Sequence, residues 1–266
     1  MSLRSSRVRT LADVTDVGLA AELVRSAARV TVLTGAGIST ESGIPDFRGP
    51  QGLWTKDPAA PAMFTIDNYL ADRDVRVRAW RNRRDHPAWT ARPNAGHRAL
   101  VDLERQGRLQ AIVTQNIDGL HQAAGSEPEL VHEIHGTIWE AVCLTCQRRT
   151  PMADVLARVE AGEEDPPCRS CDGIQKSATI SFGQALDPAV LEASVHASRD
   201  CDVFVAVGTS LQVQPAASLC GVAYDAGASL VVVNAEPTPY DGIAAAVLRE
   251  PIGRTLPRLV TEPGDA

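Results

Sequence analysis

Four of the six cysteines fall into two closely spaced pairs, a spacing typical of metal sites. Cys143 and Cys146 form one pair, Cys168 and Cys171 form the other, and the 21 residues 147–167 separate them. Four thiolates complete the tetrahedral shell of zinc and leave no position for water or substrate, so the sequence predicts one structural zinc. Disulfides or unlinked thiols are the alternative, and they suit a chain without an export signal less well.

A glycine-rich turn follows the apolar run 30–33. Gly35 and Gly37 let backbone N–H groups approach a pyrophosphate closely, as in dinucleotide-binding turns. The third glycine of that fingerprint is missing, and a bare Gly-x-Gly is also a common tight turn. The next residues, 40–49, are small, turn-forming or charged and show no apolar period. Core packing therefore does not explain this segment.

Polar residues also follow a second apolar run, 111–114. Gln115, Asn116 and Asp118 stand where open parallel sheets bind ligands. An Asx-rich turn that caps a helix has the same composition, and it is the alternative interpretation. We expect a ligand-binding loop here.

His135 is the candidate general base. It ends an alternating run, 129–135, and it is the one histidine of six that is followed by a glycine, which lets a ligand come close. An imidazole titrates near neutral pH and can accept a proton from a hydroxyl group. A structural histidine is the alternative, and His132 is expected to lie at the surface.

Five segments carry a family resemblance, taken in order along the chain. They are GAGISTESGIPDFRG at 35–49, TQNIDGLH at 114–121, His-Gly at 135–136, GTSLQVQP at 208–215 and VNAE at 233–236. Together they resemble the motifs of the sirtuins, the NAD-dependent protein deacylases, over about residues 29–260. Five motifs in the right order are very improbable by chance.

The resemblance implies which residues bind NAD. In this interpretation Asp118 accepts a hydrogen bond from the nicotinamide carboxamide, Phe47 covers the reacting ribose and Arg48 lies by the phosphates. His135 and Asn116 are the implied catalytic residues. The full set implied to bind NAD is Gly35, Ala36, Gly37, Ser39, Ile44, Asp46, Phe47, Arg48, Trp54, Gln115, Asn116, Ile117, Asp118, Gly208, Thr209, Ser210, Asn234, Ala235, Glu236 and Ile252.

The resemblance also implies the reaction, in which NAD is consumed. The acyl oxygen of an acyl-lysine attacks the ribose carbon that carries nicotinamide, and nicotinamide leaves. His135 then deprotonates a ribose hydroxyl, the acyl group migrates to it, and water completes the release of O-acyl-ADP-ribose and free lysine. The partner is thus an acyl-lysine protein or peptide.

Other functions remain open at this stage. A sirtuin-like enzyme could prefer acidic or long acyl groups, or transfer ADP-ribose. A classical NAD-dependent oxidoreductase would need an acidic residue that reads the ribose from a second strand, and none is clearly placed. A zinc-bearing protein without activity would have no use for the cofactor loop.

The acyl preference depends on two departures from the family pattern. The segment Lys176–Gln184 lacks the proline and the acidic residue that many sirtuins carry along the peptide groove. Some sirtuins also carry a Tyr-x-x-Arg pair whose arginine binds a succinyl or malonyl carboxylate, and here Trp80 and Arg83 have that spacing. Indole cannot accept a hydrogen bond, so we expect Arg83 on a solvated face and a preference for neutral acyl groups. The arginine-rich run 73–84, interleaved with aspartates, likewise indicates a solvated helix face.

Alternation of strands and helices predicts the fold. Apolar runs at 30–33, 111–114, 178–182, 203–207 and 230–233 read as strands, and segments 12–28, 96–106, 188–197 and 215–226 read as helices. This pattern indicates an α/β fold with a doubly wound, Rossmann-like parallel sheet of about six strands. The expected division is 1–50, 94–142 and 176–266 for the NAD-binding domain, with inserts at 51–93 (helical) and 143–175 (zinc ribbon).

Composition narrows the environment. The net charge of −7 argues against a dedicated nucleic-acid binder, and no apolar run approaches the roughly 18 residues of a membrane span. The N-terminal segment has no apolar core of a secretory signal. We therefore expect a cytoplasmic protein that contacts neither membrane nor nucleic acid.

Overall fold

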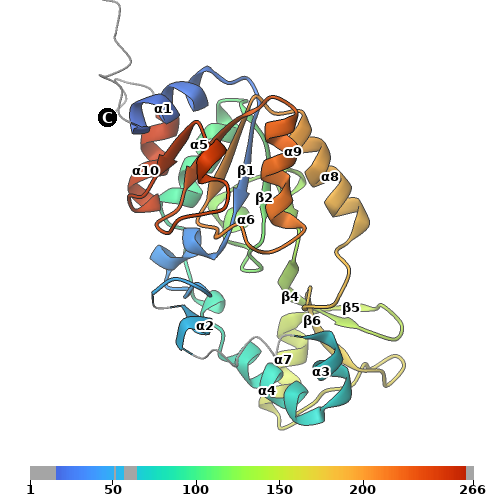
Figure 1. Cartoon of the computed structure of the whole chain (residues 1–266). Helices are drawn as coiled ribbons and strands as arrows, with labels where there is room; N and C mark the ends of the chain where they lie inside the picture. Colours follow the sequence, from blue (N-terminus) through green and yellow to red (C-terminus); the bar gives the residue numbers. More distant parts are fainter. Residues whose placement is uncertain (1–15, 51, 57–64, 262–266) are drawn as a thin grey trace, which may run out of the picture.

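A computed structural model describes residues 16–50, 52–56 and 65–261 of the chain. Positions 12–15 of the first predicted helix lie outside the described residues. Two lobes are visible, a larger one built on a parallel sheet and a smaller one below it in the view of Figure 1.

A six-stranded parallel sheet forms the larger lobe. Its strands follow the order β3-β2-β1-β7-β8-β9, and every neighbouring pair is parallel. The bounds are β1 Val30–Thr34, β2 Leu109–Thr114, β3 Val131–Glu133, β7 Val203–Val207, β8 Ser229–Val233 and β9 Ala246–Leu248. The predicted doubly wound, Rossmann-like sheet is confirmed.

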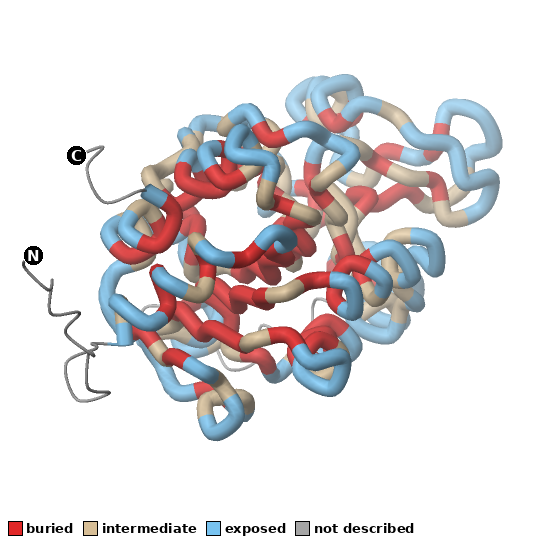
Figure 2. Tube along the Cα trace, turned by 90° about the horizontal axis from the view of Figure 1, so that it is seen from above, coloured by how far each residue is buried: buried red, intermediate tan, exposed pale blue. Residues whose placement is uncertain are grey.

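Helices cover both faces of this sheet, which explains why its strands are apolar throughout. Alternate residues of β7 face different cores: Val203 and Val205 pack with one cluster, Phe204 and Ala206 with the other. The first cluster includes residues of α1 (Asp16–Ser26), α5 (Ala95–Arg105) and α10 (Ile252–Val260), and the second includes α8 (Pro188–Arg199) and α9 (Leu219–Asp225). In Figure 2 the buried segments gather in the interior and the exposed residues lie on the outside.

The smaller lobe combines the two predicted inserts. It contains the antiparallel strands β4 (Gly136–Cys143), β5 (Arg149–Pro151) and β6 (Gln175–Thr179), in the order β5-β4-β6. Helix α7 (Met152–Glu160) packs on β4, and α4 (Arg73–Arg84) packs on α7 and on α3 (Ile66–Ala71). The zinc insert and the helical insert therefore form one body.

Two predicted strands are wrong in detail. The strand expected at 178–182 lies earlier in the chain, as β6. It belongs to the small sheet, because its backbone hydrogen bonds are made with the antiparallel strand β4. The run 129–135 is strand only at Val131–Glu133, since a 3-10 turn, η5 (Pro128–Leu130), precedes it. The domain boundaries stay a prediction, and β4 and β6 cross those drawn at 142 and 176.

The shorter elements connect these layers. They are η2 (Ala36–Ser42), α2 (Leu53–Lys56), η4 (Pro87–Trp89), α6 (Leu120–Ala124), η6 (Ala216–Ser218) and η7 (Asp241–Ile243). Among the described residues, no helix is both long and apolar enough to cross a membrane.

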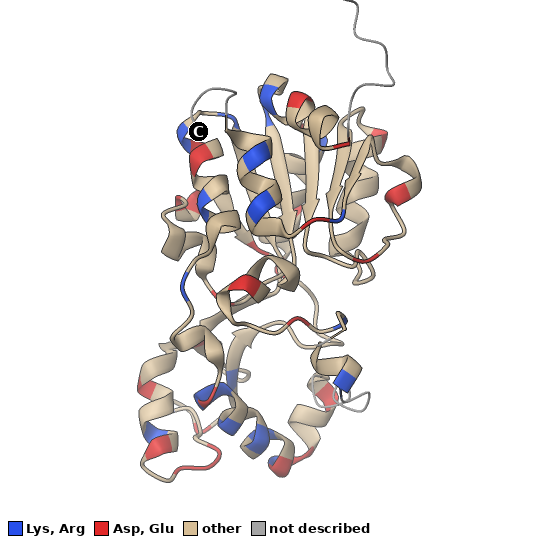
Figure 3. Cartoon of the chain, turned by 90° about the vertical axis from the view of Figure 1, so that its left-hand side faces the viewer, with Lys and Arg blue, Asp and Glu red and all other residues tan. Residues whose placement is uncertain are grey.

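The arginines of α4 are not a simple solvated face, which corrects the sequence interpretation. Arg73 and Arg81 form ion pairs with Glu164, and Arg76 forms one with Asp165 at 2.8 Å. Both acidic residues belong to the zinc insert, so opposite charges hold the two inserts together (Figure 3). The Arg76–Asp165 pair is the most protected, with side chains 13% and 16% exposed.

Asp165→Asn should therefore destabilise the small lobe. Breaking a largely buried ion pair costs about 1–3 kcal/mol, between the values for surface pairs and fully buried pairs. Thermal unfolding measures the change, and Asp102→Asn is the matched control because its pair with Arg105 is well exposed. An equal melting temperature for wild type and Asp165→Asn would show that this pair does not hold the two inserts together.

Candidate active site

One large cavity lies where the loops of the parallel sheet meet the small lobe. Its volume is about 1620 Å³, and every residue implied to bind NAD or to act in catalysis lines it. The lining segments follow the carboxyl ends of β1, β2, β3, β7 and β8, and Ile252 begins α10. Open parallel sheets bind ligands at this edge, and the structure brings all the predicted residues together there.

Two glycine turns interlock at the floor of the cavity. The N–H of Gly37 donates to the carbonyl of Gly208 over 2.8 Å. A Cβ atom on Gly37 would lie 2.6 Å from Gly208 Cα, and one on Gly35 would lie 2.7 Å from Gly208 O. Gly208 also has a φ of +60°, which favours glycine. The glycines are therefore required where the turns after β1 and β7 approach each other.

Asn116, Ser39 and Asp118 form a buried hydrogen-bond network. Asn116 Nδ2 donates to Gly35 O and to Ser39 Oγ, both over 3.1 Å, and Ser39 Oγ donates to Asp118 Oδ2 over 2.7 Å. Asp118 Oδ1 accepts the N–H of Leu120 over 3.0 Å. Each carboxylate oxygen has a further lone pair, so Asp118 can still accept a bond from a carboxamide.

Asp118 is held in place from the other side as well. The indole of Trp139 donates to its backbone carbonyl over 2.9 Å. Burial raises the pKa of the Asp118 carboxyl, while the hydrogen bonds from Leu120 and Ser39 oppose this shift. A buried carboxylate with these donors gains further stabilisation from an amide N–H.

His135 is oriented as a base. Its Nδ1 lies 3.1 Å from the carbonyl of Gln115, and because a carbonyl only accepts, Nδ1 carries the proton and Nε2 is free to receive one. Burial lowers the pKa of His135 from its ordinary value of 6.5, although the bond to Gln115 opposes this shift. The ring is therefore neutral at neutral pH, the form that a general base needs.

The glycine after His135 has a different role from the one expected. Gly136 has a φ of +72°, and a Cβ atom there would lie 2.1 Å from the carbonyl of Ala178. This close approach is the crossing of β4 and β6, so the glycine serves strand packing rather than ligand access. His132 also differs from expectation: it is partly buried, and its Nδ1 lies 3.4 Å from Ser194 Oγ.

Aromatic rings cover the outer part of the cavity. The ring centroids of Phe47 and Trp54 lie 4.9 Å apart, and those of Trp54 and Phe182 lie 5.8 Å apart. The guanidinium of Arg48 stacks 4.4 Å from the Trp54 centroid. Within the described residues no carboxylate forms an ion pair with Arg48, and burial lowers its pKa. A cation in this setting suits a pyrophosphate.

The sequence interpretation missed Arg249, which shapes the end of the cavity formed by the loop after β8. Its Nη1 donates to the carbonyls of Asn234 and Glu236, each over 2.7 Å, and its Nη2 pairs with Asp241. It thereby fixes the loop after β8. Only its place one residue beyond the short β9 run hinted at a function, and that signal is weak.

Arg83 faces the cavity instead of solvent, which corrects the sequence expectation. It is partly buried, and its Nη2 donates to Ser177 Oγ over 2.9 Å. Lys176, one of only two lysines in the chain, lines the same wall, and its Nζ donates to the carbonyls of Ser177 and Thr179. Trp80, also in the cavity wall, is 1% exposed, and its Nε1 has no partner among the described residues.

Burial disfavours the charged forms of Arg83 and Lys176. It lowers the pKa of Arg83 to about 10 and, together with the nearby Arg83 charge, that of Lys176 to about 8. No ion pair with a carboxylate stabilises either group in the described part of the chain. This wall of the cavity therefore offers donors and positive charge to an acceptor. The residues that form it are Trp80, Arg83, Lys176 and Ser177, which we call the cation wall.

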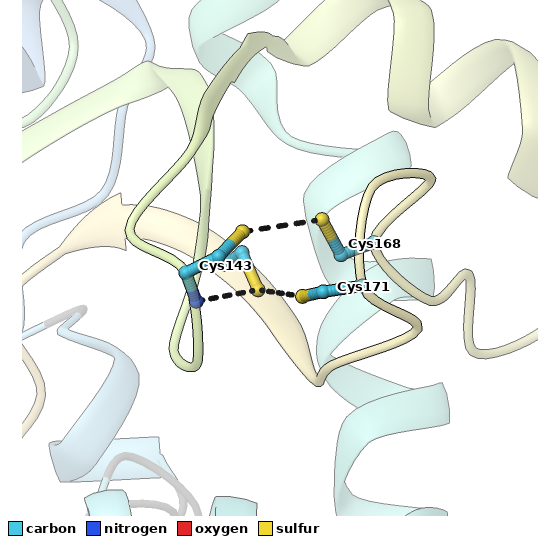
Figure 4. A group of neighbouring side chains, drawn as sticks. Cys143, Cys168 and Cys171 are labelled. Atoms are coloured by element: carbon cyan, nitrogen blue, oxygen red, sulfur yellow. Dashed lines mark hydrogen bonds between the residues drawn. The ribbon is translucent and has the colours of Figure 1, made fainter.

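The four paired cysteines meet in the small lobe (Figure 4). Their sulfur atoms all lie within 4.8 Å of one another, with 3.5 Å between Cys143 and Cys171 and 3.7 Å between Cys146 and Cys168. Zinc–sulfur bonds of about 2.3 Å in a tetrahedron place the sulfurs about 3.8 Å apart. The donor set and its spacing fit one structural zinc. Cys201 and Cys220 lie elsewhere in the core.

The fold and the cavity define a protein of the Rossmann-like class, with a ligand site at the edge of its parallel sheet and a small lobe whose four cysteines fit zinc. The model of the Sir2 family matches residues 35–215. "NAD-dependent protein deacetylase 2" of Streptomyces coelicolor is 58% identical over 231 residues, which cover 87% of this chain and 96% of that protein. The chain belongs to the Sir2 family.

Solved structures of Sir2 enzymes have the same architecture. One, described under "Structural Basis for the Mechanism and Regulation of Sir2 Enzymes", has a TM-score of 0.84 and 37% identity, and covers 92% of this chain and 96% of its own. Another, a Sir2 variant with a deacetylated p53 peptide and 3'-O-acetyl ADP-ribose, has a TM-score of 0.83 and 34% identity, and covers 90% of this chain and 95% of its own.

Zinc should be bound in a ratio of one per chain. Cys143→Ser removes a buried ligand, so zinc content should fall and the small lobe should unfold, since structural zinc contributes folding energy directly. Metal analysis and limited proteolysis measure both effects, with Cys220→Ser as a control outside the cluster. Folded, active protein that contains no zinc would refute the assignment.

The pH dependence of deacetylation should report on His135. The pKa of His135 in the folded protein is lower than 6.5, so the ring is still neutral somewhat below pH 6.5. The neutral base is lost only when the pH falls through this lowered pKa. The acid limb of kcat/KM, which reports on the free enzyme, should therefore have an apparent pKa below 6.5. An acid limb centred above 6.5 would contradict the orientation and burial described for His135.

Proposed function

We propose that this chain is an NAD-dependent protein-lysine deacetylase. It acts as an acyltransferase that moves the acyl group from lysine to ADP-ribose and releases nicotinamide. The observation that carries the proposal is the geometry around His135, whose free Nε2 belongs to the same cavity as the Ser39–Asn116–Asp118 network. A binding protein would not need a neutral, oriented base at this place.

Each group has a role that follows from its chemistry. NAD supplies a ribose whose bond to nicotinamide breaks during the reaction. Asp118 accepts the carboxamide N–H and Asn116 lies beside the ribose. Arg48 offers its charge to the pyrophosphate, and His135 Nε2 takes the proton of a ribose hydroxyl. Phe47 and Trp54 exclude water from the reacting end.

The peptide is proposed to enter along β6, at the opening between the lobes. Ile180 already donates to the His135 carbonyl over 2.8 Å, so the chain after β6 runs directly past the base. Phe182 is 42% exposed at that opening. An extended substrate can pair there by its main chain.

The proposed location is the cytoplasm, because four unlinked thiols that bind zinc suit a reducing compartment. The domain division given above is proposed with its boundaries moved, so that β4 and β6 belong to the zinc-binding lobe.

One assay tests the activity against its rivals. Purified protein is incubated with NAD and an acetylated peptide, and the products are separated. Nicotinamide and O-acetyl-ADP-ribose are the expected products. NADH would indicate an oxidoreductase, nicotinamide with ADP-ribosylated protein would indicate an ADP-ribosyltransferase, and unchanged NAD would indicate a binding protein.

A second candidate function concerns acyl groups that end in a carboxylate. The preference for neutral groups was based on the indole of Trp80 in place of a phenol and was joined to the expectation of a solvated Arg83, and the second of these is wrong. The cation wall presents Arg83 and Lys176 without an acidic partner, and Trp80 adds an unpartnered indole N–H. A succinyl or malonyl carboxylate would supply the missing negative charge.

Arg83→Ala should lower the ratio of desuccinylation to deacetylation on peptides of one sequence. A lost charged hydrogen bond costs about 1.5–3 kcal/mol, or roughly tenfold to hundredfold in kcat/KM. Arg84→Ala is the control, because Arg84 is the next residue but pairs with Asp85 in solvent. An unchanged ratio in Arg83→Ala would show that Arg83 does not bind the acyl carboxylate.

A further inference from the structure

A chain of buried hydrogen bonds runs from His121, in α6, to the backbone of Asn116. His121 Nε2 lies 3.0 Å from Thr34 Oγ1, Thr34 Oγ1 donates to Thr114 Oγ1 over 2.8 Å, and Thr114 Oγ1 accepts the Asn116 N–H over 3.1 Å. The Thr34 hydroxyl has one proton and gives it to Thr114, so His121 Nε2 is the donor at the start of the chain. All four residues are buried.

A second chain starts from His97, in α5. The N–H of Asn94 donates to His97 Nδ1 over 3.4 Å, so His97 carries its proton on Nε2. The side chain of Asn94 then donates to Ile38 O over 2.7 Å and to Ser42 Oγ over 2.9 Å. Both acceptors belong to η2, the turn that follows β1 and contributes Ser39 to the cavity.

The two histidines complement each other. Their ring centroids lie 5.0 Å apart. Within the described residues His97 Nε2 and His121 Nδ1 have no hydrogen-bond partner, and the tautomers derived above make the first a donor and the second an acceptor. Burial lowers the pKa of His97 to about 4 and that of His121 well below its ordinary value, so both rings are neutral.

We propose that His97 and His121 are a buried pair of positioning residues that fixes the two loops of the nicotinamide pocket against each other. His121 acts through Thr34 and Thr114 on Asn116, and His97 acts through Asn94 on η2. Neither histidine lines the cavity. The inference builds on the proposed deacetylase function, because it assigns these groups to the same site.

Kinetics of three single variants, one double variant and one control test the first chain. His121→Phe keeps a ring but removes the donor, His121→Gln keeps a donor nitrogen, and Thr34→Val removes the hydroxyl at constant shape. The matched control is Thr31→Val, on the same strand and equally buried, because the Thr31 hydroxyl donates to Ala197 O away from the site. The readouts are kcat for deacetylation, nicotinamide exchange and KM for the acetylated peptide.

His121→Phe and Thr34→Val should each lower kcat and nicotinamide exchange by about tenfold to hundredfold, the usual result of small misplacement of a reacting group. KM for the peptide should stay near the wild-type value, and His121→Gln should recover most of the rate. The double variant His121→Phe/Thr34→Val should be no slower than the slower single variant, because both break one chain.

Three results would overturn the proposal: wild-type kinetics in Thr34→Val, multiplied losses in the double variant, or an equal loss in Thr31→Val. Thr34→Val decides the question alone when His121→Phe does not fold. Inactive wild-type protein would instead contradict the deacetylase function itself.

The second chain predicts a different kinetic effect. His97→Phe removes the acceptor of the Asn94 N–H, so Asn94 no longer holds η2 firmly in place. KM for NAD should then rise by about tenfold, the scale of one lost hydrogen bond. Equal changes of KM and kcat in the His97 and His121 variants would indicate general loosening of the fold and would refute separate positioning roles.

Discussion

The contact between the turns after β1 and β7 is the constraint on which the site depends. The backbones meet at Gly37 and Gly208 with no room for a Cβ atom. This approach sets where η2 begins, and η2 carries Ser39 to the Asn116 and Asp118 side chains. A parallel sheet brings several loops to one edge, but only close-packed turns fix the distances between them.

The small lobe depends on a different interaction, the charge pairing between α4 and the zinc insert. One side of α4 holds Arg76 against Asp165, and the same helix carries Trp80 and Arg83 into the cavity wall. The zinc cluster holds the insert that supplies Asp165. The cysteine cluster, the ion pairs and the cation wall are thus mechanically connected, although a zinc held by four cysteines has a closed shell and would take no part in the chemistry.

The sequence predicted the sheet because its strands leave a local signal, whereas the residues that line the cavity were named through the family resemblance of five motifs. Buried parallel strands are continuous apolar runs, and the segment 40–49 stands out because it has no apolar period. Strand pairs that are distant in the chain were not predictable. The sequence of β6 suggests one more strand of the main sheet, and only the structure shows that it pairs with β4. The sequence likewise predicts a surface position for Arg83, because only the packing of α4 on α3 and α7 turns this side chain inward.

The most direct test of the central claim, that His135 is a base acting after nicotinamide departs, is isotope exchange in His135→Ala. Labelled nicotinamide is incubated with NAD, acetylated peptide and this variant, and both exchange into NAD and peptide deacetylation are followed. Exchange should persist, because the Ser39–Asn116–Asp118 network is intact. Deacetylation should fall by about 100-fold or more, the scale of a lost general base. Deacetylation at the wild-type rate, or loss of exchange in a folded variant, would contradict the role assigned to His135.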